Sequence, residues 1–115
     1  MVRVQNPENG ALGIDIQGHL DTGAERSVFP GWVASAIGLV LLDGEAAQLS
    51  ATVGPVHDAR LHDVFVSHDV LGGCRLTVAF TLEDTARSLL GRDLLNVLQI
   101  GFRGRYQEFY VTATP

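Results

Sequence analysis

The sequence contains no lysine, and its eight basic residues are arginines spread along the 115 residues. Charged residues make up 18% of the chain, below the roughly 25% of average soluble proteins. The net charge is -5 and basic residues do not cluster, so neither nucleic acid nor an anionic membrane is an expected partner. Low charge and a mean hydropathy of +0.19 favour some apolar surface reserved for a subunit interface.

Cysteine occurs once, at Cys74, so the chain cannot form an internal disulfide. Cys74 precedes an alternating run and has no cluster of basic neighbours, which favours a small structural thiol over a nucleophile. The first residues lack the apolar core of a signal peptide. The sequence therefore predicts a cytoplasmic protein.

Several motifs of other enzyme classes are absent, namely GxSxG, a phosphate-binding glycine loop, a dinucleotide fingerprint, HExxH and a calcium loop. His57, His62 and His68 are each followed by aspartate. On a strand, His57 and His62 point to opposite faces, and His62 and His68 lie about 20 Å apart at roughly 3.3 Å per residue. The three are therefore predicted to be solvated hairpin residues, and neither a metal nor a cofactor is expected.

The pattern predicts one domain over residues 1–115, without linkers or repeats. Alternating or short apolar runs predict an all-β chain. The expected strands are 1–5 at an edge, 13–20, 47–53, 56–66, 76–82 with its even face in the core, 88–90, 100–103 and 106–112. A short helix is expected after Pro30, with Trp32, Val33, Ala36 and Ile37 on its inner face and Gly38 at its end. A second helix is expected from Gly91, with Leu94, Leu95 and Leu98 facing inward.

The strand 13–20 is expected to present Asp21 at its end. Ile14, Ile16 and Leu20 alternate with polar residues, so they share one strand face. Thr22 can bond to the backbone, and Gly23 allows a close approach that a side chain would forbid. Taken alone, Asp-Thr-Gly is more typical of a simple hairpin turn, because all three are turn residues.

Two longer segments carry more information. Residues 20–29, Leu-Asp-Thr-Gly-Ala-Glu-Arg-Ser-Val-Phe, and residues 89–95, Leu-Leu-Gly-Arg-Asp-Leu-Leu, resemble the two signatures of the retropepsin-like aspartic proteases. This resemblance implies a single-lobe closed β-barrel or sandwich along almost all of the chain. It also implies a flap hairpin and one short helix near the C-terminus.

The resemblance implies an endopeptidase in which Asp21 is catalytic. Because the chemistry needs two carboxyl groups that share a proton and Asp93 has a structural part in the family, the second group would be Asp21 of another copy. A homodimer is therefore expected, with a bell-shaped pH profile on the acid side of neutrality. The partners would be a peptide or protein substrate and a second copy of the chain.

Further roles are implied by the same resemblance. Glu25 and Arg92 would form an ion pair that ties the loop to the helix. Support of the active-site loop is implied for Thr22, Gly23, Ser27 and Arg92. Substrate contacts are implied for Gly23, Ala24 and Glu25 in the loop and for Val53, Gly54 and Pro55 at the flap.

A second class of function stays open, a catalytically silent module that keeps the fold for dimerisation or peptide binding. An intact Asp-Thr-Gly favours the enzyme, because a pure binding module does not need the carboxylate of Asp21.

Overall fold

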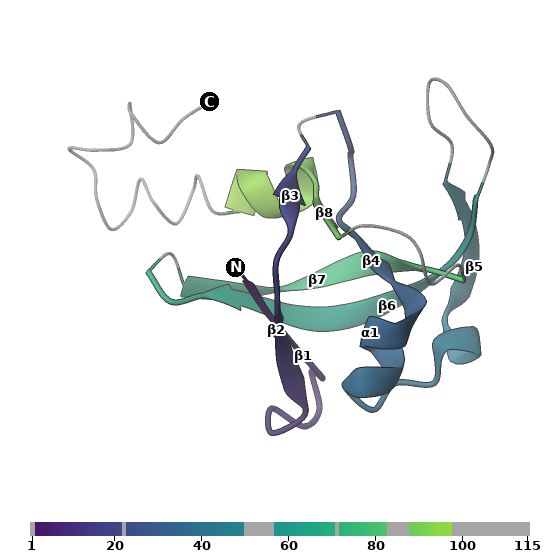
Figure 1. Cartoon of the computed structure of the whole chain (residues 1–115), viewed down its shortest axis with the longest axis horizontal. Helices are drawn as coiled ribbons and strands as arrows, with labels where there is room; N and C mark the ends of the chain where they lie inside the picture. Colours follow the sequence, from purple (N-terminus) through teal and green to yellow (C-terminus); the bar gives the residue numbers. More distant parts are fainter. Residues whose placement is uncertain (1, 22, 50–56, 71, 83–87, 98–115) are drawn as a thin grey trace.

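The longest element of the protein is an antiparallel hairpin of two strands, β6 (His57–His68) and β7 (Gly72–Thr81). Their register runs from Ala59 opposite Thr81 to His68 opposite Gly72, and Gly72 has a φ of 87° at the turn. This computed structural model describes residues 2–21, 23–49, 57–70, 72–82 and 88–97. Every other strand of the sheet is built outward from this hairpin (Figure 1).

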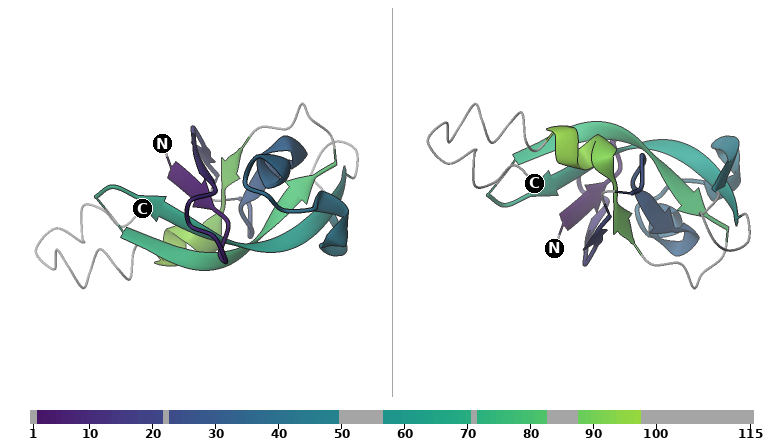
Figure 2. Two further views of the ribbon diagram at one scale, coloured as in Figure 1. Left: turned by 90° about the horizontal axis from the view of Figure 1, so that it is seen from below. Right: turned by 90° about the horizontal axis from the view of Figure 1, so that it is seen from above.

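Within the described residues, eight strands form one sheet in the order β2-β1-β6-β7-β4-β8-β3, and β5 pairs with the free part of β6. The sheet curls into a half-barrel, as Figure 2 shows from two sides. The remaining elements are β1 (Val2–Gln5), β2 (Gly13–Ile16), β3 (His19–Leu20), β4 (Val28–Pro30), α1 (Gly31–Ala36), the 3-10 turn η1 (Leu41–Asp43), β5 (Glu45–Leu49), β8 (Leu89–Leu90) and helical residues 92–97. The prediction of a mostly β chain is confirmed.

The hydrophobic core lies against one face of the β6–β7 hairpin. Val64, Val66, Val78 and Phe80 alternate along the two strands and are at most 1% exposed, because strand side chains point alternately to opposite faces. Phe80 contacts Phe29 of β4, with ring centroids 6.0 Å apart. The even face predicted for residues 76–82 is thus in the core, except that Leu82 is 37% exposed.

The prediction of one strand over residues 13–20 is wrong. β2 pairs with β1, whereas β3 pairs with β8, so the chain passes between two parts of the sheet near Gly18. A Cβ atom at Gly18 would lie 2.8 Å from Cγ of Leu90, and glycine permits this close approach. Leu20, expected on the buried face, is 69% exposed.

Two smaller predictions also need correction. β1 is not an edge strand, because it pairs with β2 on one side and β6 on the other. Helix α1 does start after Pro30, and Gly38 has the positive φ of 80° that a helix end favours. Its inner face is formed by Val33, Ala34 and Ile37, while Trp32 and Ala36 are exposed.

The expected hairpin over residues 47–66 is present as the pair β5–β6, with Leu49 opposite His57. Its tip at Gly54 and Pro55 lies outside the described residues, as do Leu98 and the strands expected over 100–103 and 106–112. None of the helices in the described part of the chain is long and apolar enough to cross a lipid bilayer.

Candidate functional site

The segment that carries Asp21 is a loop that joins β3 to β4 across the end of β8. β3 pairs with β8 in parallel, through His19 opposite Leu89, and β4 pairs with β8 antiparallel, through Val28 opposite Leu89. β8 therefore lies between the two strands that bracket the loop. The backbone N–H of Asp21 donates to the carbonyl of Leu90 at 3.0 Å, which joins the loop to the end of β8.

Asp21 itself lies in a tight turn. The N–H of Gly23 donates to Oδ1 of Asp21 at 2.9 Å, and the N–H of Ala24 donates to the carbonyl of Asp21 at 3.2 Å. These bonds orient the carboxylate, which stays half-buried. A Cβ at Gly23 would lie 3.2 Å from Oδ1 of Asp21, so even alanine would press on the carboxylate. Thr22 lies outside the described residues.

The loop is tied to the start of the last helical segment through its backbone. The N–H of Arg92 donates to the carbonyl of Ala24 at 2.8 Å, and the N–H of Asp93 donates to the carbonyl of Glu25 at 3.2 Å. The first N–H groups of a helix have no partner within the helix. Here the loop carbonyls supply two of those partners, so the two signature segments interlock.

A side-chain pair, formed by the buried Ser27 and the partly buried Asp93, reinforces the same junction. The N–H of Ser27 donates to both carboxylate oxygens of Asp93 at 3.0 Å, and its hydroxyl donates to Oδ1 at 2.7 Å. The N–H of Gly91 donates to Oγ of Ser27 at 3.0 Å. Ser27 is fully buried, and hydrogen bonds to an ionised group contribute about 1.5–3 kcal/mol each. The bond between Asp93 and Ser27 was not predicted from the sequence, although both residues belong to the signature segments.

Gly91 is required where the two segments cross. A Cβ atom there would lie 2.7 Å and 2.8 Å from the carbonyl carbon and oxygen of Arg26, and 2.9 Å from the carbonyl oxygen of Ala24. Those atoms are backbone, so they cannot turn aside as a flexible side chain would. The glycine therefore allows the loop to lie directly against the helix start.

The predicted ion pair between Glu25 and Arg92 is present, with Nη2 of Arg92 3.3 Å from Oε1 of Glu25. The side chains are 88% and 50% exposed, and exposed pairs contribute roughly 0–1 kcal/mol. The ion pair adds little stability beside the partly buried hydrogen bonds of Asp93.

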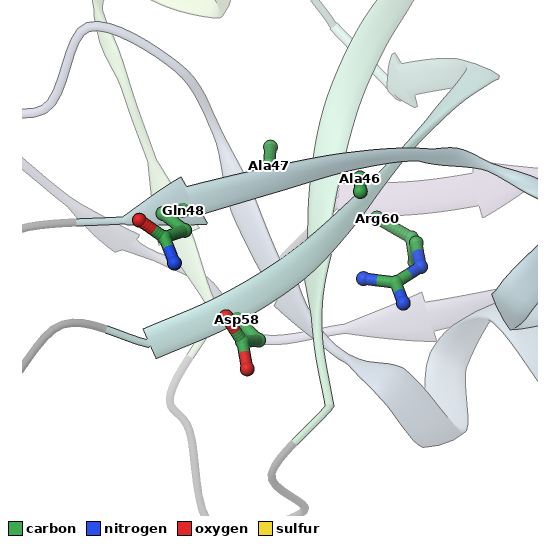
Figure 3. A pocket seen from close by; sticks show the side chains of 5 residues that line it. All are labelled: Ala46, Ala47, Gln48, Asp58 and Arg60. Atoms are coloured by element: carbon green, nitrogen blue, oxygen red, sulfur yellow. The ribbon is translucent and has the colours of Figure 1, made fainter.

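The surface hollow at the β5–β6 hairpin does not include Asp21. It has a volume of about 450 Å³ and is lined by Ala46, Ala47, Gln48, Asp58 and Arg60 (Figure 3). Ala46 is opposite Arg60 and Gln48 opposite Asp58, so these four lie on one face of the hairpin. Val53, Gly54 and Pro55, predicted to contact substrate, lie outside the described residues.

One histidine of β6, His62, differs from the solvated residue that was expected. Nε2 of His62 donates to the carbonyl of Leu41 at 2.8 Å, and its ring packs edge-on against Phe80 at 5.7 Å between centroids. His62 thus holds η1, the turn that leads into β5. Across the residues that the structure describes, His, Cys, Asp and Glu side chains do not form a group of three or more that could hold a metal ion.

Cys74 lies on β7, partly buried against the core. Burial raises the pKa of the Cys74 thiol above its ordinary value of 9.0, and the negative charge of Asp93 raises it further. The uncharged thiol is therefore favoured at neutral pH, in agreement with the predicted structural role.

Comparisons with known proteins define the fold. Among solved structures, the chain is similar to the EIAV protease complexed with the inhibitor HBY-793, at 20% sequence identity and a TM-score of 0.52, over 85% of each chain. No protein-family model matches the sequence, and no curated protein does. The chain has the retropepsin-like fold, as its two signature segments predicted.

Proposed function

We propose that the protein is an aspartic endopeptidase that hydrolyses peptide bonds with the Asp21 carboxylates of two identical chains. The observation that carries this proposal is the Asp21 loop, whose carboxylate accepts the N–H of Gly23 and whose backbone is bound to β8 and to the helix start. Catalytic groups need such fixed positions, because misplacement by about 1 Å can cost about a hundredfold in rate. The retropepsin-like fold supports the same reaction class.

The neighbouring carboxylates of the same chain are already engaged. Oδ1 of Asp93 accepts three hydrogen bonds, from both donors of Ser27 and from the N–H of Leu94, and Oδ2 accepts the N–H of Ser27. Glu25 is paired with Arg92. The second carboxyl group of the dyad is therefore Asp21 of a second copy, which a two-fold axis beside the loop would supply.

The apolar surface beside Asp21 supports a dimer. Leu20 is 69% exposed although it directly precedes Asp21. A two-fold axis that brings two Asp21 side chains together also brings the two Leu20 side chains toward the interface. Burial of a leucine side chain there would contribute about 1.5–3 kcal/mol.

In the proposed reaction, one Asp21 carboxylate takes a proton from water as the water oxygen bonds to the carbonyl carbon of the scissile peptide bond. The protonated Asp21 of the other copy donates its proton to the carbonyl oxygen. When the resulting gem-diol collapses, its hydroxyl proton returns to the dyad, the C–N bond breaks, and the dyad protonates the leaving amine. One proton stays on the pair, ready for the next cycle.

The remaining roles are proposed from the resemblance of the two signature segments to the retropepsin-like proteases. Gly23, Ser27 and Arg92 would hold the loop through the contacts described above, and Thr22 would join the two loops of the dimer. Gly23, Ala24 and Glu25 would line the substrate channel. Val53, Gly54 and Pro55 would contact the substrate from the flap.

Digestion of a mixed peptide library by wild type and by Asp21→Asn tests the proposal. Wild type should cleave, and Asp21→Asn should lose more than about a thousandfold of the activity, because its amide cannot accept the proton of water. Asp15→Asn is the matched control, since Asp15 is an exposed residue of β2 that pairs with Arg3. Cleavage that survives in Asp21→Asn would refute the mechanism. Peptide binding without cleavage by wild type would instead identify the catalytically silent module.

A further inference from the structure

Arg26 is a cation on the loop that carries Asp21. The residue is exposed, and its Nη1 donates to the carbonyl of Thr77 on β7 at 3.0 Å. This bond uses one of the five N–H donors of the guanidinium. Among the residues that the structure describes, the group is thus anchored at this one point.

The acids of the described residues near Arg26 are paired with other arginines. Glu25, its neighbour in sequence, pairs with Arg92 at 3.3 Å. Asp63, which accepts the hydroxyl of Thr77, pairs with Arg75 at 3.6 Å. Arg26 has no ion pair with any residue that the structure describes. In a chain with a net charge of -5, it is a local positive site beside the proposed catalytic group.

Arg26 and Asp21 lie near opposite ends of the loop that joins β3 to β4 across the end of β8. His19 and Val28 are both opposite Leu89, so all three side chains share one face. Asp21 directly follows β3, and Arg26 lies two residues before β4. The backbone of each meets the end of β8, since the N–H of Asp21 donates to the carbonyl of Leu90 and the carbonyl of Arg26 lies against Gly91. Ser27 is fully buried against Asp93, whereas Arg26 is exposed.

We propose that Arg26 determines specificity by binding an acidic side chain of the substrate close to the scissile bond. The inference rests on the proposed peptidase function. Arg26 follows Asp21 by five positions, a chain length that spans at most about 18 Å. An extended peptide covers that length in about five residues, so the acidic side chain should lie within about five residues of the cut. Two N–H groups of the guanidinium can hold a carboxylate bidentately.

The test compares cleavage of a peptide library by wild type, Arg26→Glu, Arg26→Lys and the control Arg3→Gln, whose arginine lies on β1. Wild type should prefer Asp or Glu over Asn or Gln at one position near the cut by about fivefold, the size of one exposed charge pair. Arg26→Glu should reverse the preference toward Lys or Arg. Arg26→Lys and Arg3→Gln should retain the preference for acids. Higher salt should weaken it in wild type.

The outcomes separate this inference from the proposed function. Asp21-dependent cleavage with the same sequence preference in wild type and Arg26→Glu would overturn the role of Arg26 and leave the peptidase intact. If wild type does not cleave at all, the peptidase proposal fails, and binding decides the role of Arg26. An acidic peptide and the same peptide with Asn or Gln in place of the acid would then be titrated into wild type and Arg26→Glu. If wild type binds the acidic peptide more tightly and Arg26→Glu does not, the role of Arg26 is supported. If wild type binds the two peptides equally, the role is overturned.

Discussion

At the scale of single residues, the candidate site depends on Ser27 and Asp93 more than on the exposed pair Glu25–Arg92. All donors of Ser27 are directed at one carboxylate, and its hydroxyl oxygen accepts the N–H of Gly91. Buried groups without a partner cost about 1–3 kcal/mol, whereas exposed ion pairs contribute roughly 0–1 kcal/mol. Asp93 and Ser27 therefore set the position of the loop.

The variant Ser27→Ala should lower the free energy of unfolding by about 1–3 kcal/mol, because Oδ1 of Asp93 loses a donor and the N–H of Gly91 loses its acceptor. Urea denaturation measures the change. Ser35→Ala is the control, since Ser35 is exposed on α1 and its removal should change stability by less than about 0.5 kcal/mol. Equal stability of the two variants would show that the buried hydrogen bonds of Ser27 contribute nothing.

The pKa of the Cys74 thiol predicts how the stability of the fold depends on pH. Because burial and Asp93 raise the pKa of its thiol above 9.0 in the folded chain, the folded state holds the proton more tightly than the unfolded state. The stabilising contribution is complete below the unfolded pKa and is lost as pH rises through the folded pKa. Unfolding free energy should therefore decrease less steeply above pH 9 in Cys74→Ala than in wild type. A steeper decrease in the variant would contradict the raised pKa.

At the scale of elements, the Asp21 loop and the helix start form one unit through close backbone contact. Ala24 and Glu25 accept N–H groups of Arg92 and Asp93, and the crossing is possible because residue 91 has no Cβ. The elements that define the site are thus far apart in sequence and adjacent in space.

The variant Gly91→Ala should destabilise the fold by more than about 2 kcal/mol, since its Cβ would overlap with backbone atoms of Arg26 and Ala24. Gly10→Ala is the matched control, because its Cβ would make only an ordinary contact of 3.7 Å with Gln5. Thermal unfolding of both variants would decide the matter. A wild-type melting temperature for Gly91→Ala would mean that the loop does not need this close approach.

Elements also show what could be predicted from sequence. Alternation predicted β5 and β7, and an apolar stretch predicted β6. The two signature segments predicted the Glu25–Arg92 pair and indicated Asp21 as the candidate catalytic residue. All of these depend on local patterns. The break between β2 and β3 depends on which distant strand each one pairs with, namely β1 or β8. The local alternation across residues 13–20 does not contain that information. The bonds of Asp93 to Ser27 and of His62 to Leu41 were likewise missed, because they join segments that are far apart in the chain.

At the scale of the whole molecule, the proposed chemistry makes dimerisation a condition of activity. A single chain contributes one Asp21, and the neighbouring carboxylates are held by Ser27 and by Arg92. In a two-fold dimer, the exposed Leu20 side chains would be buried close to the two aspartates. Activity per chain should therefore fall when the protein is diluted below the dissociation constant of the dimer.

The most direct measurement mixes wild type with Asp21→Asn at constant total concentration, after dilution and reconcentration have let the subunits exchange. If the dyad is shared, only dimers of two wild-type chains are active, so activity follows the square of the wild-type fraction. An equal mixture should then have about one quarter of the activity of pure wild type at the same total protein concentration. Retention of about one half, linear in the wild-type fraction, would show that each chain is active by itself and would contradict the shared dyad.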